Sequence, residues 1–440
     1  MATVLKQAQP LGRRLEDQRK ISDTVARMIE TIRADRDAAV REYSKNLDKW
    51  SPPDFRLSPD EIQSALRTVA QTVLEDIRFC QAQVRTFAQA QKRSLGEFEI
   101  ETLPGVRLGQ KNIPIANVGS YVPGGRYPMV ASAHMSIVPA KVAGVERIAA
   151  CTPPLHGEIP RITVAAMHLA GADEIYIFGG VQAVAALALG TESIPKVDFF
   201  AGPGNAYVAE AKRQLFGEVG IDLLAGPTEI LVVADETADP KIVAADLLSQ
   251  AEHGPTSPAI LISLSRQLAD EVLAEIPRQL ATLPTADVAR TAWETQGQVL
   301  LVETREEAVM QADAFAAEHV EVMTRDHRYF LEHMRNYGAL FLGEGTTVAY
   351  GDKTIGTNHI LPTSNAATYT GGLWVGKYLK TVTYQECDPA GSLAIGQVAA
   401  RQCRIENFEG HARACDLRVE KYGSGTAAQR SDSSPPQAET

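Results

Sequence analysis

The sequence lacks the features that mark membrane, secreted and nucleic-acid-binding proteins. It has no run of about 18 apolar residues, so we expect no membrane span, and its first residues lack the apolar core of a secretory signal. Acidic residues outnumber basic ones, 54 to 43, and the net charge of -11 argues against a nucleic-acid partner. The 5 cysteines have no C-x-x-C spacing, which predicts reduced thiols. We therefore expect a cytoplasmic protein.

The order of predicted elements indicates an α/β fold. The first part of the 440-residue chain is charged and helix-prone, and Ser58 followed by Pro59 is a typical helix start. From about residue 112, short β-branched runs alternate with alanine-rich helical runs, which predicts βαβ units around buried parallel sheets. We expect two incomplete Rossmann-like domains with attachments, divided into a helical N-terminal region (1–111), a first α/β domain (112–225), a second α/β domain (226–375), a C-terminal appendage (376–422) and a disordered tail (423–440).

Two glycine-rich turns precede predicted helices in the first α/β domain. Gly202 and Gly204 stand before one helix, and the Gly179-Gly180 pair stands before another. Free N–H groups at a helix start can bind phosphate. Neither stretch matches the G-x-G-x-x-G dinucleotide fingerprint, so tight strand–helix turns are the favoured interpretation.

The helix predicted over residues 239–254 carries a polar stripe on a mostly apolar body. Asp239 and Pro240 mark its start, and Asp246, Gln250 and His253 follow at i, i+4 and i+7. Gln250 and His253 project from one face at the C-terminal end, which attracts cations. A solvated helix face is the alternative, and two such residues do not complete a metal site.

Two further stretches have residues suited to proton transfer or binding. Glu318 and His319 follow a predicted helix and stand at the start of an apolar strand, where an acid beside a histidine suits acid–base chemistry. The loop 351–363 has Asp352 as a possible metal ligand and His359 as a possible substrate contact. A surface pair and ordinary turn chemistry are the alternatives.

The order of these stretches along the chain resembles the histidinol dehydrogenase family over about residues 25–415. The resemblance rests on the segments GSYVPGG, PAKVAGV, GTESIPKVD, GPGNAYVAEAKRQ, LLAGPTEILVVAD, LLSQAEHGP, AEHVEV and GTNHILPT. It implies a homodimeric enzyme that oxidises a primary alcohol through an aldehyde to a carboxylate, with one zinc ion per subunit and two NAD reduced in succession.

The resemblance also assigns roles to residues. His319 becomes the general base for the alcohol, and Glu318 activates the water that attacks the aldehyde. The implied zinc ligands are Gln250, His253, Asp352 and His411, the last from the partner subunit. The implied NAD contacts, in the first α/β domain, are Tyr121, Gln182 and Asn205. The implied substrate contacts are Thr228, where the family usually has serine, His359, and Glu406 from the partner subunit.

One departure from the family pattern bears on the substrate. After VPGG the chain continues with RYPMVASAHM, which introduces Arg126, Tyr127 and His134. A guanidinium would repel cationic histidinol and suits a sulfonate, phosphate or carboxylate. The variant resembles the sulfopropanediol dehydrogenase branch, so we expect a small anionic alcohol, 2,3-dihydroxypropane-1-sulfonate, that is oxidised to 3-sulfolactate with Arg126 as a substrate contact. L-histidinol oxidised to L-histidine is the alternative substrate, and a non-catalytic binding protein on the same scaffold is a third reading.

Overall fold

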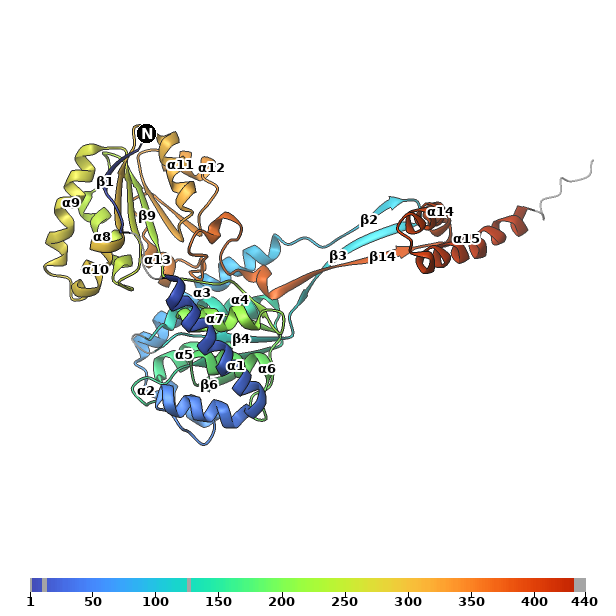
Figure 1. The fold of residues 1–440 in the computed structure, drawn as a ribbon, viewed down its shortest axis with the longest axis horizontal. Helices are drawn as coiled ribbons and strands as arrows, with labels where there is room; N and C mark the ends of the chain where they lie inside the picture. The colour runs from blue at the N-terminus through green and yellow to red at the C-terminus, as the bar shows by residue number, and fades with distance from the viewer. Residues whose placement is uncertain (1, 10–13, 125–127, 431–440) are drawn as a thin grey trace, which may run out of the picture. The chain divides into compact units, whose positions relative to one another are not determined.

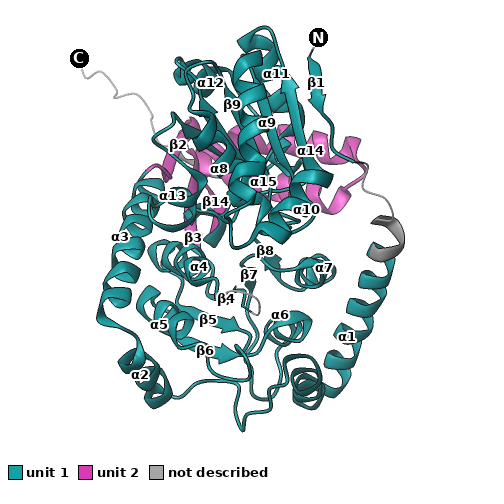
Figure 2. Ribbon diagram, turned by 90° about the vertical axis from the view of Figure 1, so that its left-hand side faces the viewer, with its two compact units in different colours: residues 1–93, 114–378 teal, residues 94–113, 379–440 magenta. Residues whose placement is uncertain are grey.

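The chain divides into two compact units (Figure 2). The computed structural model describes residues 2–9, 14–124 and 128–430. Unit 1 comprises Met1–Arg93 and Pro114–Tyr378, and unit 2 comprises Ser94–Ile113 and Leu379–Thr440. Within the described ranges, no helix combines the length and the apolar character that crossing a membrane requires.

The first sheet of unit 1 has five parallel strands in the order β6-β5-β4-β7-β8. Its strands are β4 (Asn117–Tyr121), β5 (Arg147–Thr152), β6 (Glu174–Ile177), β7 (Phe199–Ala201) and β8 (Gly220–Ile221). The helices between them are α4 (Val130–Ala143), α5 (Arg161–Ala170), α6 (Gly180–Leu189) and α7 (Ala206–Leu215). The strand order reverses between β4 and β7, and ligands of open α/β sheets bind at the carboxyl ends of strands at such a point.

The second sheet of unit 1 repeats this order and adds an antiparallel edge strand, giving β1-β11-β10-β9-β12-β13. Its strands are β1 (Thr3–Lys6), β9 (Ile230–Ala234), β10 (Ala259–Ser263), β11 (Gly297–Leu301), β12 (His319–Met323) and β13 (Ala339–Leu342). The two sheets confirm the expected α/β fold class with incomplete Rossmann-like domains.

Helices cover both faces of the second sheet (Figure 1). One core joins the sheet to α8 (Pro240–Ala251), α9 (Arg266–Leu280) and α10 (Ala286–Gln296). The other core joins it to α11 (Arg305–Phe315) and α12 (His327–His333). The short helix α13 (Val348–Lys353) follows β13, and its first residue, Val348, packs into the α8 core. The strands are buried on both faces, which explains their nearly continuous apolar sequences.

Helices dominate the N-terminal part of unit 1, as expected. They are α1 (Arg14–Tyr43), the π-helical turn η1 (Ser44–Asp48), α2 (Pro59–Thr68) and α3 (Gln71–Arg93). The start of α2 is the predicted one, since the Ser58 hydroxyl accepts from the Glu61 N–H and the Glu61 carboxylate accepts from the Ser58 N–H. Helix α1 packs on α6 and α7, and α3 packs on α4.

Unit 2 consists of a three-stranded sheet and two helices. The sheet has the order β14-β3-β2, with β2 (Phe98–Leu103), β3 (Val106–Pro114) and β14 (Leu379–Cys387), and the helices are α14 (Pro389–Ile405) and α15 (Glu409–Arg430). Residues 98–111 are therefore strands and not helical, because polar and apolar residues alternate there with the period of a strand. Residues 423–430, expected to begin the disordered tail, continue α15.

Candidate active site

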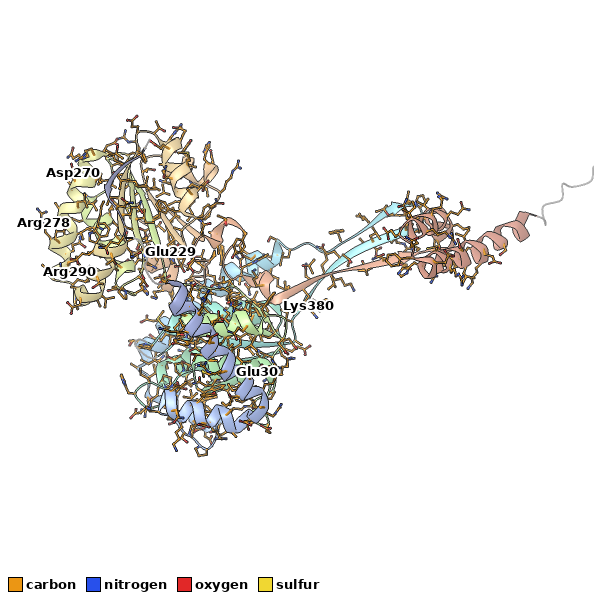
Figure 3. The ribbon with its side chains drawn as sticks, in the orientation of Figure 1. Glu30, Glu229, Asp270, Arg278, Arg290 and Lys380 are labelled. Carbon is orange, nitrogen blue, oxygen red and sulfur yellow. The ribbon has the colours of Figure 1, made fainter. Side chains whose placement is uncertain are left out.

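The candidate catalytic residues lie at the amino-terminal edge of the second sheet. His319 is the first residue of β12, and Glu229 immediately precedes β9. The two segments are joined there by a hydrogen bond from the His319 N–H to the Glu229 carbonyl at 3.3 Å. Helix α8 leaves the carboxyl end of β9 and returns along the sheet, so Gln250 near its C-terminus reaches this edge. Figure 3 shows Glu229 within unit 1, whereas Asp270 and Arg278 of α9 extend into solvent.

Glu318 and His319 form a buried pair whose polar atoms are closely held. One Glu318 oxygen, Oε2, accepts from the Thr228 hydroxyl at 2.5 Å and from the Glu229 N–H at 3.0 Å. The same oxygen lies 3.5 Å from His319 Nδ1. Nδ1 also lies 3.0 Å from the Glu229 carbonyl oxygen, which can only accept, so Nδ1 carries a proton. The other ring nitrogen, Nε2, is buried and has no hydrogen-bond partner among the described residues.

The surroundings raise the pKa values of both members of this pair. Burial raises the pKa of Glu318 to about 7, against the opposing effects of His319 and the Thr228 hydroxyl. Burial alone would lower the pKa of His319, but the carboxylates of Glu318 and Asp352 raise it to about 9. A carboxyl group that titrates near neutral pH is typical of proton-transfer sites, whereas His319 with this pKa is mostly protonated at neutral pH and becomes a free base at higher pH.

Three of the four implied metal ligands line one cavity of about 360 Å³ in unit 1. They are Gln250, His253 and Asp352. The Gln250 amide nitrogen donates to the Thr228 hydroxyl, which leaves the oxygen Oε1 as the atom that can bind a cation. Burial lowers the pKa of His253, and a neutral imidazole is the form that binds metal. The solvated face considered for α8 is therefore wrong, because Asp246 and Gln250 are buried.

The donor set agrees in chemistry with a nitrogen–oxygen zinc site. Across residues 2–9, 14–124 and 128–430, no three or more His, Cys, Asp and Glu side chains form a group that could hold one metal ion. A set built on Gln250, His253 and Asp352 contains only two residues of those types. The fourth implied ligand, His411, belongs to unit 2.

The loop after α13 brings His359 beside the same carboxylate. His359 Nδ1 lies 3.0 Å from the Asp352 carbonyl oxygen and 4.0 Å from its side-chain Oδ1, and His319 Nε2 lies 3.8 Å from Oδ1. On its other side, His359 Nε2 lies 3.3 Å from the Ser132 hydroxyl of α4. Burial lowers the pKa of His359. Asp352 thus links both histidines to the cavity.

The three implied NAD contacts lie at the carboxyl edge of the first sheet. Tyr121 ends β4, and its hydroxyl accepts from the Gly180 N–H at 3.2 Å. Gln182 in the first turn of α6 donates to Asp48 Oδ2 at 2.9 Å, and Asn205 caps α7 by accepting from the N–H groups of Tyr207 and Val208. Asp48 also accepts from the Gly179 N–H. Sequence reasoning missed Asp48, because 134 residues separate it from Gln182.

Several predicted residues belong to unit 2, to the core of unit 1 or to the part of the chain outside the described ranges. Glu406 and His411 belong to unit 2 and are exposed there. Arg126 and Tyr127 lie outside the described residues. His134 is buried in α4 with Nδ1 at 3.1 Å from the Gln81 amide nitrogen, and burial lowers its pKa to about 4, so it is a neutral core residue.

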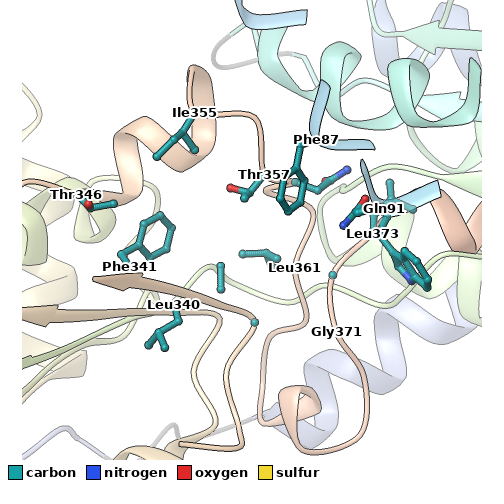
Figure 4. Close-up of a pocket in the computed structure, with 15 residues that line it drawn as sticks. Phe87, Gln91, Leu340, Phe341, Thr346, Ile355, Thr357, Leu361, Gly371 and Leu373 are labelled. Carbon is teal, nitrogen blue, oxygen red and sulfur yellow. The ribbon is translucent and has the colours of Figure 1, made fainter. Parts of the chain in front are cut away.

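A second cavity of about 390 Å³ is lined in part by the loop that carries His359, through Thr357, Asn358 and Leu361 (Figure 4). Its lining is mostly apolar and includes Phe87, Phe341, Leu361 and Trp374. None of its lining residues is charged. It lacks the chemistry of the cavity around Gln250 and is not the candidate catalytic site.

Comparison with known proteins places the chain in one family. The profile of the histidinol dehydrogenase family matches residues 11–419. A histidinol dehydrogenase homolog of Shouchella clausii is 59% identical over 96% of this chain and 100% of its own length. The sulfopropanediol 3-dehydrogenase of Ruegeria pomeroyi is 48% identical (92% and 94%), and the histidinol dehydrogenase of Gluconobacter oxydans is 40% identical (93% and 96%).

A solved structure agrees with this placement. The histidinol dehydrogenase of Elizabethkingia anophelis superposes with a TM-score of 0.87 at 32% identity, covering 93% of this chain and 97% of that one. The fold, the sequence motifs and the relatives all indicate the same family. The chain belongs to the histidinol dehydrogenase family, NAD-dependent oxidoreductases that act on an alcohol and then on the aldehyde formed from it.

Proposed function

We propose that the chain is a zinc- and NAD-dependent dehydrogenase that converts 2,3-dihydroxypropane-1-sulfonate to 3-sulfolactate in two successive hydride transfers. The observation that carries the reaction is the buried Glu318–His319 pair, with an unpartnered His319 Nε2 close to Asp352. Two observations support this choice of substrate. One relative is named sulfopropanediol 3-dehydrogenase, and Arg126 directly follows the family segment VPGG in the sequence. The thiols, all free in the structure, support a reducing compartment such as the cytoplasm.

His319 serves the alcohol step as the general base. Its Nδ1–H is held by the Glu229 carbonyl, so Nε2 takes the hydroxyl proton in the neutral form of the imidazole, which a pKa of about 9 makes the major form only above that pH. Glu318 and Asp352 stabilise the imidazolium that results. The hydride leaves the same carbon for NAD, whose nicotinamide accepts both electrons.

Glu318 serves the aldehyde step by accepting a proton from water. The water oxygen bonds to the aldehyde carbon, and the hydrate then gives its hydride to a second NAD. The balanced reaction is one alcohol, two NAD⁺ and one water giving one carboxylate, two NADH and three protons. A pKa near 7 makes Glu318 ionised in half of the molecules at neutral pH, which suits a base that releases its proton each turnover.

Gln250, His253 and Asp352 are the zinc ligands that unit 1 supplies under this proposal. Bound zinc would polarise and orient the substrate hydroxyl and the aldehyde oxygen. His359 and Thr228, which lie beside Asp352 and Glu318, would contact the substrate. Tyr121, Gln182 and Asn205 would contact NAD at the carboxyl edge of the first sheet, near the strand-order reversal.

The enzyme works as a homodimer in which unit 2 completes the partner's site with His411 and Glu406. Exposed apolar side chains beside these residues support a partner surface there, namely Ile405, Phe408 and Leu417. Mixing two inactive variants tests the arrangement. In a mixed dimer of H253A and H411A chains, one site has its own His253 and the partner's His411, so activity returns to about a quarter of wild type after random exchange. If His411 served its own chain, no activity would return.

A two-substrate assay tests the reaction and the choice of substrate. We expect NADH formation with 2,3-dihydroxypropane-1-sulfonate, with two NADH per substrate, and little with L-histidinol. R126A should raise the KM for the sulfonate, because a charge-assisted hydrogen bond contributes about 1.5–3 kcal/mol, while R290A on the exposed surface of α10 is the matched control. Turnover of histidinol alone, unaffected by R126A, would favour histidinol dehydrogenase. Absence of zinc and of NADH formation would leave a binding protein.

A further inference from the structure

Two carboxyl side chains meet in the interior behind the candidate catalytic residues. Asp246 precedes Gln250 by one helical turn on α8, and Glu321 follows His319 by two residues on β12. Side chains at these spacings share a face of their element. Thr347 and Val348, which are neighbours in sequence, donate hydrogen bonds to Asp246 and Glu321 respectively, so the two carboxyl groups lie near each other behind the Gln250–His319 contact at the sheet edge. No role in the reaction described above uses either carboxyl group.

In each carboxyl group, one oxygen accepts a hydrogen bond and the other has no hydrogen-bond donor among the described residues. Asp246 Oδ1 accepts from the Thr347 hydroxyl at 3.0 Å, and Glu321 Oε1 accepts from the Val348 N–H at 2.7 Å. Asp246 Oδ2 and Glu321 Oε2 are buried without a hydrogen-bond partner in the described parts of the chain. Glu321 is 0% exposed and Asp246 is 8% exposed. Buried polar atoms are almost always paired, so this arrangement needs an explanation.

One proton between the two groups supplies the missing hydrogen bond. Two ionised carboxylates at this depth would repel each other and leave both oxygens unsatisfied. A neutral acid beside an ionised one donates its O–H to the partner and satisfies both. Glu321 is the natural holder of the proton because it is the more buried of the two. Burial, followed by the charge of Asp246, raises its pKa well above the usual value, and burial also raises the pKa of Asp246.

The pair accepts hydrogen bonds from the residues that begin α13. Thr347 is the N-cap of this helix, since its hydroxyl accepts from the Ala349 N–H, and Val348 is its first residue. Asp352 lies near the other end, one turn further on. A helix of 6 residues has little stability of its own, so its placement depends on such contacts.

We propose that Asp246 and Glu321 share one proton, held by Glu321, and that the pair positions Asp352 against His319 by anchoring α13. Both are positioning residues, since neither touches the atoms that react. The part of the proposal that concerns Asp352 as a zinc ligand rests on the proposed function. The shared proton does not, because it follows from the burial and pairing of the two side chains alone.

Infrared difference spectroscopy tests the proton without zinc or NAD. We expect a carboxylic-acid carbonyl band in the wild-type protein at about pH 9, two units above the pKa of Glu318, which is then ionised. The band should be lost in E321Q and kept in E332Q, an exposed glutamate of α12 that serves as the matched control. If the wild-type spectrum has no such band, or if E321Q keeps it, the shared proton on Glu321 is wrong.

Zinc affinity and kinetics test the positioning. Glutamine mimics a protonated glutamate, since its oxygen can accept from Val348 and its NH₂ can donate to Asp246, so E321Q should keep zinc affinity and kcat/KM close to wild type. E321M has the same length but cannot pair, and should lose about 10- to 100-fold in both. If E321Q loses as much as E321M, or if E321M loses neither, the positioning role is overturned.

A milder variant keeps the positioning test decisive if E321M does not fold. T347V removes the hydroxyl that donates to Asp246 and that also caps α13, and it should weaken zinc binding without removing the infrared band. Unchanged zinc binding in T347V would overturn the anchoring of α13. A wild-type protein that binds no zinc and reduces no NAD would refute the proposed function and the Asp352 part of this proposal together, while the infrared result would still decide on the proton.

Discussion

The hydroxyl of Thr228 offers a direct test of how the pKa of Glu318 is set. This hydroxyl donates to Glu318 Oε2 at 2.5 Å and accepts from the Gln250 amide. A donor to a carboxylate stabilises the ionised form, so it lowers the pKa against the larger effect of burial, which raises it. T228V keeps the volume and removes the donor. The pKa of Glu318 must then rise further above its present value of about 7.

The size of the shift follows from the strength of one charge-assisted hydrogen bond. Such a bond contributes about 1.5–3 kcal/mol, and one pKa unit corresponds to about 1.4 kcal/mol. The pKa of Glu318 should therefore rise by roughly one to two units in T228V. Because Glu318 acts as a base in the aldehyde step, activity falls as the pH drops below its pKa. The acidic limb of the profile should move from about pH 7 to between about 8 and 9.

The measurement is the pH dependence of NADH formation with the aldehyde supplied as substrate. The position of the acidic limb is the readout, because the loss of the Gln250 contact can lower the amplitude but does not move the limb. T228S is the matched control, since serine keeps the hydroxyl, and its limb should stay at the wild-type position. A limb that stays in place or moves to lower pH in T228V would refute the assignment of Glu318 as the water-activating base.

Three other predictions concern the scaffold and the metal. G202A should lower the free energy of unfolding, measured by chemical denaturation, by more than about 2 kcal/mol and should weaken NAD binding. The reason is that Gly202 has φ +119° and an added Cβ would lie 2.1 Å from the Tyr121 carbonyl oxygen. G217A is the control, since Gly217 has φ +107° but open space around it, and it should cost only about 1 kcal/mol. K212M should cost about 3–5 kcal/mol by leaving the buried Asp222 carboxylate unpaired, and a K212M/D222L double variant that is no more stable than K212M would contradict this account. Dialysis against a chelator should abolish NADH formation, and zinc should restore it; activity that persists in a metal-free preparation by elemental analysis would exclude a zinc requirement.

The parallel sheets were predictable because their signals are local. A buried strand such as β9 is a continuous β-branched run, and α8 begins at Asp239 and Pro240 as its capping residues predict. The strands β2 and β3 of unit 2 were missed although polar and apolar residues alternate in them, whereas the edge strand β1 was missed because its signal is not local. β1 pairs with β11, nearly 300 residues away in sequence by its Thr3–Leu301 register. A short segment of this kind becomes a strand through a distant partner, and no pattern within a window of ten residues records that partner.

The burial of the polar stripe of α8 could not be predicted from the sequence of that helix alone. On the helix alone, Asp246, Gln250 and His253 are typical of a face turned to solvent, since polar residues at helical spacing usually lie there. The structure turns the stripe inward because β12 presents polar side chains of its own, His319 and Glu321, between apolar neighbours. Each polar row would be costly to bury by itself, and the two rows are stable only against each other. A buried strand with the sequence His-Val-Glu-Val-Met therefore predicts polar side chains on the element that packs against it. Glu321 was the residue in the sequence that indicated such a neighbour.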